Sequence, residues 1–173
     1  VFTYTVRDAD GDETTAILTI TIQNNQPPVA NNDTRTTPED TPVSGNVLNG
    51  SGGDVADTDP DSDPLTVTQI VINGITTPVP VDGSTVSVDI PGCGTLVINN
   101  TGAYTFAPVS DWHSTVPDIT YTINDGKGAT NSTATAVLKI TVTPVVDIAD
   151  DKISTPAGNP VKTPVLGNDS FEN

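Results

Sequence analysis

The sequence has little of several residue types on which other kinds of protein depend. Its 173 residues contain no methionine, one cysteine, one tryptophan and only 4% aromatic residues. The single cysteine, Cys93, excludes an internal disulfide, so the core and any bound metal must supply the stability. Scarce aromatic residues leave Val, Ile and Leu to build that core. No apolar run approaches the roughly 18 residues of a membrane-spanning helix, so we expect no membrane insertion.

Basic residues are scarce as well. Six lysines and arginines stand against 22 acids, and the formal net charge is −16. This sign of charge disfavours binding to nucleic acid or to an anionic membrane surface. Nineteen of the acids are aspartate and only three are glutamate. Aspartates beside Gly, Pro and Asn are typical of cation-binding turns, whereas general surface acidification would use Glu freely.

The abundant residues are those of β-structure. The sequence has 29 threonines, 15 prolines and 14 glycines, together with many valines and isoleucines. Thr, Val and Ile favour strands, and Pro and Gly interrupt them. The composition therefore predicts an all-β fold class.

A strand–turn–strand pattern occurs twice in the chain. Residues 1–7 and 16–22 predict a β-hairpin. Residues 120–125 repeat its first strand at an offset of 117, and residues 136–142 repeat its second at an offset of 120. Further matches at an offset of 118 follow both hairpins, for example Asp33 with Asp151. Such a period indicates a tandem array.

The period divides the chain into three expected parts. Residues 1–26 are predicted to be the C-terminal hairpin of a preceding repeat, 27–143 one complete repeat, and 144–173 the start of the next. The chain begins in mid-strand without an initiator methionine, so we expect it to be a piece of a longer polypeptide. Neighbouring repeats of the same chain are then its expected partners.

Short strands fill the predicted complete repeat. About seven to nine of them, separated by regular turn signals, indicate an antiparallel β-sandwich of the immunoglobulin-like (Ig-like) or cadherin-like type. The strands preceding the closing hairpin are expected near residues 34–37, 43–48, 65–73, 79–81, 85–90, 94–99 and 103–106.

Three motifs carry a family resemblance. Gly94-Thr95-Leu96-Val97-Ile98, with Gly102, Tyr104, Phe106 and Pro108 after it, resembles the core of bacterial VCBS and cadherin-like tandem repeats. The stretches Glu39–Leu48 and Asp57–Val67 resemble the opening of these repeats, and Tyr121–Gly126 resembles their closing hairpin. The sequence departs from the pattern at Cys93 and in the second closing turn, which lacks the acids of the first.

The resemblance implies a role as well as a fold. Such repeats form the stalks of large bacterial surface and biofilm adhesins, often RTX adhesins exported by type I secretion. It therefore implies an extracellular, non-enzymatic extender module at the cell surface that calcium stiffens, while other modules of the parent protein bind the host surface or the biofilm.

The stretch Asp57–Pro64 is the first candidate metal site. It places Asp57, Asp59, Asp61 and Asp63 at alternate positions, and prolines keep it from forming a helix. In an extended chain four carboxylates then face one side and repel unless a cation or water separates them. Oxygen ligands on a flexible loop suit Ca²⁺. An EF-hand is excluded because Ser62 and Thr68 stand where that loop needs Gly and Glu.

A sandwich brings further acids to its two ends. At the end that faces the preceding repeat we expect Asp33 and Asp125 beside the Asp57–Asp63 run. At the opposite end we expect a second calcium site. The alternative there is that Glu39 and Asp40 only cap a turn. A third run in the first hairpin either binds calcium weakly or is solvated. The second site comprises Glu39, Asp40, Asp147, Asp150 and Asp151, and the third run comprises Asp8, Asp10 and Asp12.

Other chemistry finds little support in the sequence. His113 is the only histidine, and no second His or Cys stands near it, so a structural role is expected. Cys93 lacks any motif of a thiol nucleophile. The alternative function is a module that binds carbohydrate or protein, for which Trp112 is the one clear aromatic candidate.

Overall fold

The computed structural model describes residues 1–21, 24–128, 130–146 and 151–164. Within these ranges it contains strands and no helix. The strands are β1 Phe2–Arg7, β2 Glu13–Leu18, β3 Asp33–Pro38, β4 Val43–Asn46, β5 Thr66–Ile72, β6 Ile75–Pro78, β7 Thr85–Ile90, β8 Gly94–Asn99, β9 Ala103–Pro108, β10 Ser114–Thr115, β11 Ile119–Asn124 and β12 Thr133–Thr143.

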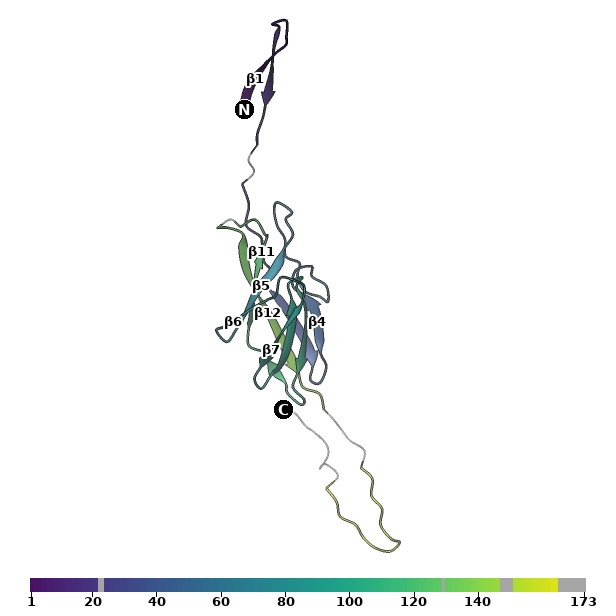
Figure 1. Cartoon of the computed structure of the whole chain (residues 1–173). Helices are drawn as coiled ribbons and strands as arrows, with labels where there is room; N and C mark the ends of the chain where they lie inside the picture. Colours follow the sequence, from purple (N-terminus) through teal and green to yellow (C-terminus); the bar gives the residue numbers. More distant parts are fainter. Residues whose placement is uncertain (22–23, 129, 147–150, 165–173) are drawn as a thin grey trace.

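Strands β3 to β12 form a β-sandwich (Figure 1), as the composition and turn spacing predict. One sheet has the order β10-β12-β11-β5-β6, and β3 also pairs with β12. The other sheet has the order β4-β9-β8-β7. The pairing of β3 with β12 is parallel, whereas the other strand pairs are antiparallel. This parallel pair brings the start of the sandwich beside its last strand.

Branched aliphatic residues build the core between the sheets, as the low aromatic content requires. Alternate residues of β8 and β11 point inward, and Leu96, Ile98, Ile119 and Ile123 are at most 1% exposed. This alternation is the period-2 pattern of a strand with one buried face. Phe106 and Tyr121 are the two buried aromatic rings with less than 2% exposure. Together these side chains fix the two sheets face to face.

The β1–β2 hairpin lies outside the sandwich in Figure 1. Its pairing of Tyr4 with Ala16 matches the pairing of Tyr121 with Ala136 in the β11–β12 hairpin. Yet Tyr4 is 52% exposed, whereas Tyr121 is 1% exposed. The β1–β2 hairpin thus has the same strand register as the β11–β12 hairpin, but no second sheet of the described residues covers its Tyr4 side. The boundaries expected at residues 26 and 143 stay predictions.

Three strand expectations differ from the structure. β4 ends at Asn46, two residues before the expected end at residue 48. β2 ends at Leu18, and residues 19–21 that were expected to continue it are not in a strand. The strand expected at residues 79–81 lies instead at Ile75–Pro78, as β6. The reason is a tight turn at Asn73-Gly74, where both residues have positive φ angles of 51° and 77°. This is the conformation of a two-residue type I′ hairpin turn, which pairs β6 directly with β5.

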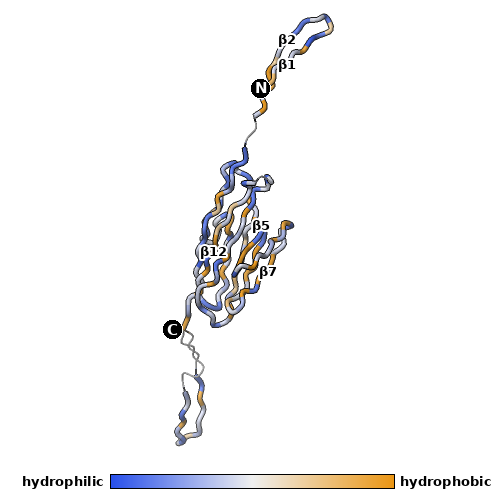
Figure 2. Tube along the Cα trace, turned by 90° about the vertical axis from the view of Figure 1, so that its left-hand side faces the viewer, coloured by the Kyte–Doolittle hydropathy of each residue, from blue (hydrophilic) through white to orange (hydrophobic). Residues whose placement is uncertain are grey.

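Figure 2 shows hydrophilic residues gathered at the end of the sandwich next to the β1–β2 hairpin. Three segments meet at this end, which we call the linker pole. They are the linker 24–32, the loop 47–65 between β4 and β5, and the residues 125–128 and 130–132 between β11 and β12. The Val29 and Thr58 backbones join the first two segments through a pair of hydrogen bonds of 2.8 and 3.0 Å. The linker and the β4–β5 loop are therefore joined by backbone hydrogen bonds at the linker pole.

Candidate metal centre

Three of the four alternate aspartates form a cluster at the linker pole. Carboxylate oxygens of Asp59, Asp61 and Asp63 all lie within 4.8 Å of one another. The loop is held in this shape by the Asp59 Oδ1 atom, which accepts hydrogen bonds from the amides of Asp61 at 2.8 Å and Asp63 at 3.2 Å. Asp59 Oδ2 is buried and has no hydrogen-bond partner among the residues that the structure describes. The cluster therefore keeps a buried carboxylate oxygen for a cation.

The linker is attached to the acids of this pole. The Gln26 amide donates to Asp61 Oδ2 at 2.6 Å, and its side-chain amide donates to Asp61 Oδ1 at 3.1 Å. Asn25 Nδ2 donates to Asp125 Oδ2 at 2.8 Å. Asn131 in turn donates from Nδ2 to the Asn25 carbonyl at 2.6 Å. Carboxylates thus hold the segment that leads to the preceding hairpin.

Lys127 lies in the same group of side chains. Its Nζ atom is 2.7 Å from Asp63 Oδ1. The hydrogen bond to Asp63 and the charges of Asp63, Asp125 and Asp59 raise the pKa of Lys127, although partial burial opposes the shift. Asn24, Asn25, Asp61, Asp63 and Lys127 line a polar hollow of about 250 Å³. The pole therefore carries one tethered cation of its own.

The fourth aspartate, Asp57, is separate from this cluster and lies against Asp33. Asp33 is 0% and Asp57 7% exposed. The hydroxyl of Tyr121 is 3.2 Å from Asp33 Oδ2 and 3.3 Å from Asp57 Oδ2. The same hydroxyl lies 2.8 Å from the Asn31 carbonyl. The expectation that four carboxylates face one side is therefore wrong, because Asp57 turns into the protein to meet Asp33 and Tyr121.

Burial sets the electrostatics of the Asp33–Asp57 pair. Loss of water raises the pKa of Asp57 to about 6, and Asp33 adds to the shift, although hydrogen bonds from the Asn31 amide and Tyr121 oppose it. Burial likewise raises the pKa of Asp33, against a hydrogen bond from the Val55 amide. A single hydroxyl proton faces two carboxylates and a carbonyl. The pair therefore has more acceptors than donors, which favours a shared proton or a nearby cation.

The opposite end of the sandwich, which we call the exit pole, is organised by Glu39. This residue is 3% exposed. Its Oε1 atom accepts a hydrogen bond from the Val145 amide, and its Oε2 atom lies 3.6 Å from His113 Nδ1. Asp40 Oδ1 accepts from the Asp111 amide at 3.2 Å, and Asp40 has a positive φ of 58°. Both acids thus fix turns where the chain leaves the sandwich, and His113 contributes to the same contact.

The aspartates of the first hairpin form a second cluster, which is exposed. Carboxylate oxygens of Asp8, Asp10 and Asp12 also lie within 4.8 Å of one another. Asp8 Oδ1 accepts from the amides of Gly11 at 3.0 Å and Asp12 at 2.8 Å. Hydrogen bonding, first with the Asp10 side chain and then with these amides, lowers the pKa of Asp8. The turn is therefore shaped like the Asp59–Asp63 loop but is exposed on all sides.

A comparison with family models matches residues 25–144 to the bacterial cadherin-like domain. The chain belongs to this family. No curated protein matches it. Membership in the bacterial cadherin-like family favours a structural or adhesive extracellular module over an enzyme. None of the described residues lies in a helix of the length and apolarity needed to cross a membrane.

The remaining candidate ligands of this cadherin-like chain lie after its sandwich. Asp151 is exposed, in a described segment of residues 151–164 that forms no strand. Asp147 and Asp150 lie outside the described residues. The second calcium site expected at the exit pole therefore stays a prediction.

The donor set of the linker pole fits calcium. Asp59, Asp61 and Asp63 supply hard carboxylate oxygens, the ligands that Ca²⁺ prefers. The buried Asp59 Oδ2 atom has no hydrogen-bond partner among the described residues, and a bound cation would supply one. Lys127 already balances part of the charge through Asp63, so a metal ion would compete with this ammonium group.

Sequence reasoning missed several residues of this cadherin-like domain. Lys127 could have been found from its position in the closing turn, two residues after Asp125. This turn corresponds in the repeat to the acidic turn of the first hairpin. Asp54 gave no signal, since its role depends on the fold. It is 9% exposed and accepts from the Tyr104 hydroxyl at 3.0 Å and from the Asn46 amide at 2.9 Å. Its Oδ1 atom also lies 3.8 Å from Arg35 Nε, so this buried charge is paired.

Proposed function

We propose that the chain is a non-catalytic extender module of a bacterial extracellular adhesin, in which Ca²⁺ at the poles stiffens the junctions between repeats. The observation that carries the proposal is the attachment of the linker to the acids of the linker pole, through Gln26 to Asp61 and Asn25 to Asp125. A cation bound by the same acids would fix the position of the linker. The angle between one repeat and the next would then depend on calcium.

Charge repulsion supplies the mechanism. Two carboxylates whose oxygens lie within 4.8 Å repel by about 3 kcal/mol at an effective dielectric constant of about 20. Water and salt reduce this repulsion at exposed oxygens. Without calcium, the repulsion between Asp59, Asp61 and Asp63 favours an open loop that releases Gln26. With calcium, the neutralised acids keep the loop closed on the linker. Asp59, Asp61 and Asp63 are the residues that would hold the ion.

The acidic turn Asp8–Asp12 supports the same proposal for the preceding hairpin. In the β11–β12 hairpin the corresponding turn lies at the linker pole and contains Asp125 and Lys127. By the matching register of the two hairpins, Asp8, Asp10 and Asp12 belong to the linker pole of the preceding repeat. At the exit pole, Glu39 fixes the Val145 amide, and Asp151 follows in the segment that leads onward. The proposed neighbours are therefore repeats of the same chain.

A sugar-binding or enzymatic role has no comparable support. Trp112, the candidate aromatic platform, is partly buried and packs against the core. Cys93 is half-buried, and burial raises the pKa of its thiol, which disfavours the reactive thiolate.

Thermal melting with calcium and with a chelator tests the proposal. We expect the melting temperature to rise with calcium, because the ion binds the folded loop and not the unfolded chain. Asp59→Asn together with Asp61→Asn should remove the rise, whereas Asp118→Asn, an exposed acid far from both clusters, should preserve it. An unchanged melting temperature in the wild-type protein at millimolar calcium would contradict the calcium role.

A further inference from the structure

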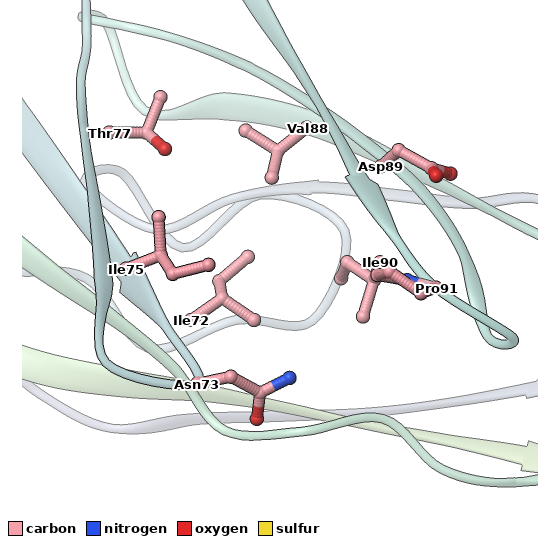
Figure 3. A pocket seen from close by; sticks show the side chains of 8 residues that line it. All are labelled: Ile72, Asn73, Ile75, Thr77, Val88, Asp89, Ile90 and Pro91. Carbon is pink, nitrogen blue, oxygen red and sulfur yellow. The ribbon is translucent and has the colours of Figure 1, made fainter.

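An apolar cleft opens on the side of the sandwich, between the β5–β6 hairpin and β7. It has a volume of about 140 Å³, enough for one large apolar side chain. Figure 3 shows that Ile72 and Ile75 face Val88 and Ile90 across it. Asn73, Thr77, Asp89 and Pro91 complete the lining. None of the acids of the poles takes part, so this surface is independent of the calcium proposal.

The cleft lies where an edge strand of one sheet meets an edge strand of the other. β6 ends the six-stranded sheet next to β5, and β7 ends the four-stranded sheet next to β8. Alternate residues of such a strand direct their amide and carbonyl groups away from their one neighbour. β6 is only four residues long and ends in Pro78, and a proline cannot donate to a further strand. β7 has six residues and no proline, so it is the edge open to pairing.

The side chains beside this edge leave an apolar surface that an added strand could cover. Val86, Val88 and Ile90 of β7 point inward, while Thr85, Ser87 and Asp89 are exposed on the outer face. Ile75 of β6 is 71% exposed across the cleft. A strand paired with β7 would direct alternate side chains inward, where they would cover Ile75 and fill the cleft. The added strand would extend the four-stranded sheet beyond β7, so that it lies opposite β6 of the other sheet.

Charge determines which kind of strand fits. Asp89 lies on the outer face of β7, and Asp82 lies in the exposed loop just before the strand. No Lys or Arg lines the cleft, and the net charge of the chain is −16. A second copy of this chain would bring like charge to the same place, whereas lysine or arginine at the outward positions would pair with Asp89. We propose that the β6–β7 cleft binds an extended peptide segment of a partner protein, with apolar residues at alternate inward positions and basic residues between them.

A peptide titration tests this proposal. The probe is a labelled seven-residue peptide of alternating lysine and isoleucine, added to the full chain with calcium present, and binding is followed by fluorescence anisotropy. A lysine–serine peptide controls for charge alone, and a glutamate–isoleucine peptide controls for apolar contact alone. We expect the lysine–isoleucine peptide to bind at least about fivefold more tightly than either control, and to shift the backbone amide NMR signals of Thr85–Ile90.

Two pairs of variants locate the site. Asp89→Lys should weaken binding at least about fivefold, whereas Asp118→Lys, which changes the net charge equally on the other sheet, should weaken it less than about twofold. Ile75→Ser should weaken binding in the same way, and Ile17→Ser is its control, since Ile17 is 68% exposed on the first hairpin. All four positions are on the surface, so folding should be unaffected.

Several results would overturn the proposal. Equal binding of the lysine–serine peptide would show attraction by the net charge alone. Amide shifts confined to β4 or to the first hairpin would place the acceptor edge elsewhere. Protection of the β7 backbone amides from hydrogen exchange in a dimer of this chain, without peptide, would assign the cleft to a second copy.

Discussion

The ammonium group of Lys127 lies 2.7 Å from a carboxylate oxygen of Asp63. Lys127 stands in the turn of the β11–β12 hairpin, while the β1–β2 hairpin has Asp8, Asp10 and Asp12 in its turn. The linker pole therefore pairs a cation of its own with an acid of its cluster, whereas in the first hairpin Arg7 Nε donates to the Gly11 carbonyl and lies 3.5 Å from Glu13 instead of pairing with an aspartate of the turn. The two junctions should accordingly differ in how strongly they depend on calcium.

Removing this lysine should strengthen calcium binding. In Lys127→Gln the acids Asp59, Asp61 and Asp63 lose their tethered cation, so we expect an increase in affinity of about three- to tenfold at low ionic strength. Isothermal titration with calcium measures the effect. Lys139→Gln is the control, because Lys139 pairs with the exposed Asp118 at 3.7 Å and should leave the affinity unchanged. Weaker calcium binding in Lys127→Gln would show that Lys127 shapes the loop instead of competing with the ion.

The Asp33–Asp57 pair should make stability depend on pH when calcium is chelated. The folded-state pKa of Asp57 is raised to about 6, so its protonated form is favoured by folding. Its contribution is then complete below about pH 4 and is lost as the pH rises through about 6. The loss is on the order of 2–3 kcal/mol for this buried group. Asp125, whose pKa is lowered, acts in the opposite direction, so a single profile does not isolate the effect.

The variant Asp57→Asn isolates the effect, because it removes the charge and keeps an oxygen for the Asn31 amide. The difference in unfolding free energy between wild type and Asp57→Asn, measured by urea titration from pH 4 to 7, should turn against wild type as the pH rises. A constant difference would contradict a raised pKa for Asp57.

Gly45 is required by close packing. A Cβ atom at this position would lie 2.1 Å from Asp54 Oδ2 and 2.7 Å from the Tyr104 hydroxyl oxygen. Gly45→Ala should therefore displace the buried Asp54–Tyr104 contact and lower the unfolding free energy by about 2–4 kcal/mol. Thr34→Ala, on an exposed strand position, should change it by less than about 0.5 kcal/mol. Urea denaturation of both variants provides the comparison, and equal stability of the two would show that the loop around Asp54 yields freely.

The first hairpin should add nothing to the stability of the sandwich. Phe2, Tyr4 and Val6 are 62%, 52% and 54% exposed, so removal of residues 1–23 takes away no buried apolar side chain among the described residues 1–21. Calorimetry should find the melting temperature of the shortened chain within about 2 °C of the original. A larger drop would mean that the hairpin packs on the sandwich in solution.

Much of the fold could be predicted from the sequence because local patterns determine it. Alternation in residues 94–99 and 103–106, with the turn at Asn100–Gly102, gave a hairpin that the structure contains as β8 and β9. The signal for β6 is also present in the sequence, since Asn73-Gly74 is a strong hairpin turn, but the expected strand 65–73 includes Asn73 and the next expected strand begins only at residue 79. β10 pairs only Ser114 and Thr115 with β12, and two residues carry no periodicity.

The candidate site was predictable only in part. The spacing of Asp59, Asp61 and Asp63 indicated their cluster, because neighbours along an extended loop stay close. The same spacing placed Asp57 with them, yet Asp57 is bound by Tyr121, 64 residues away. Contacts of this kind depend on how the sheets pack, so a single sequence holds no local signal for them. The parallel pairing of β3 with β12, which brings Asp33 to the site, arises in the same way.

Small-angle X-ray scattering of a chain with three tandem copies of residues 24–143 tests the central claim most directly. The claim predicts a maximum dimension that is longest in millimolar calcium and shortens when a chelator is added, because the linkers then bend. Asp59→Asn with Asp61→Asn in each copy should give the short form in both conditions. A maximum dimension that is the same with calcium and with chelator would contradict calcium-stiffened extension.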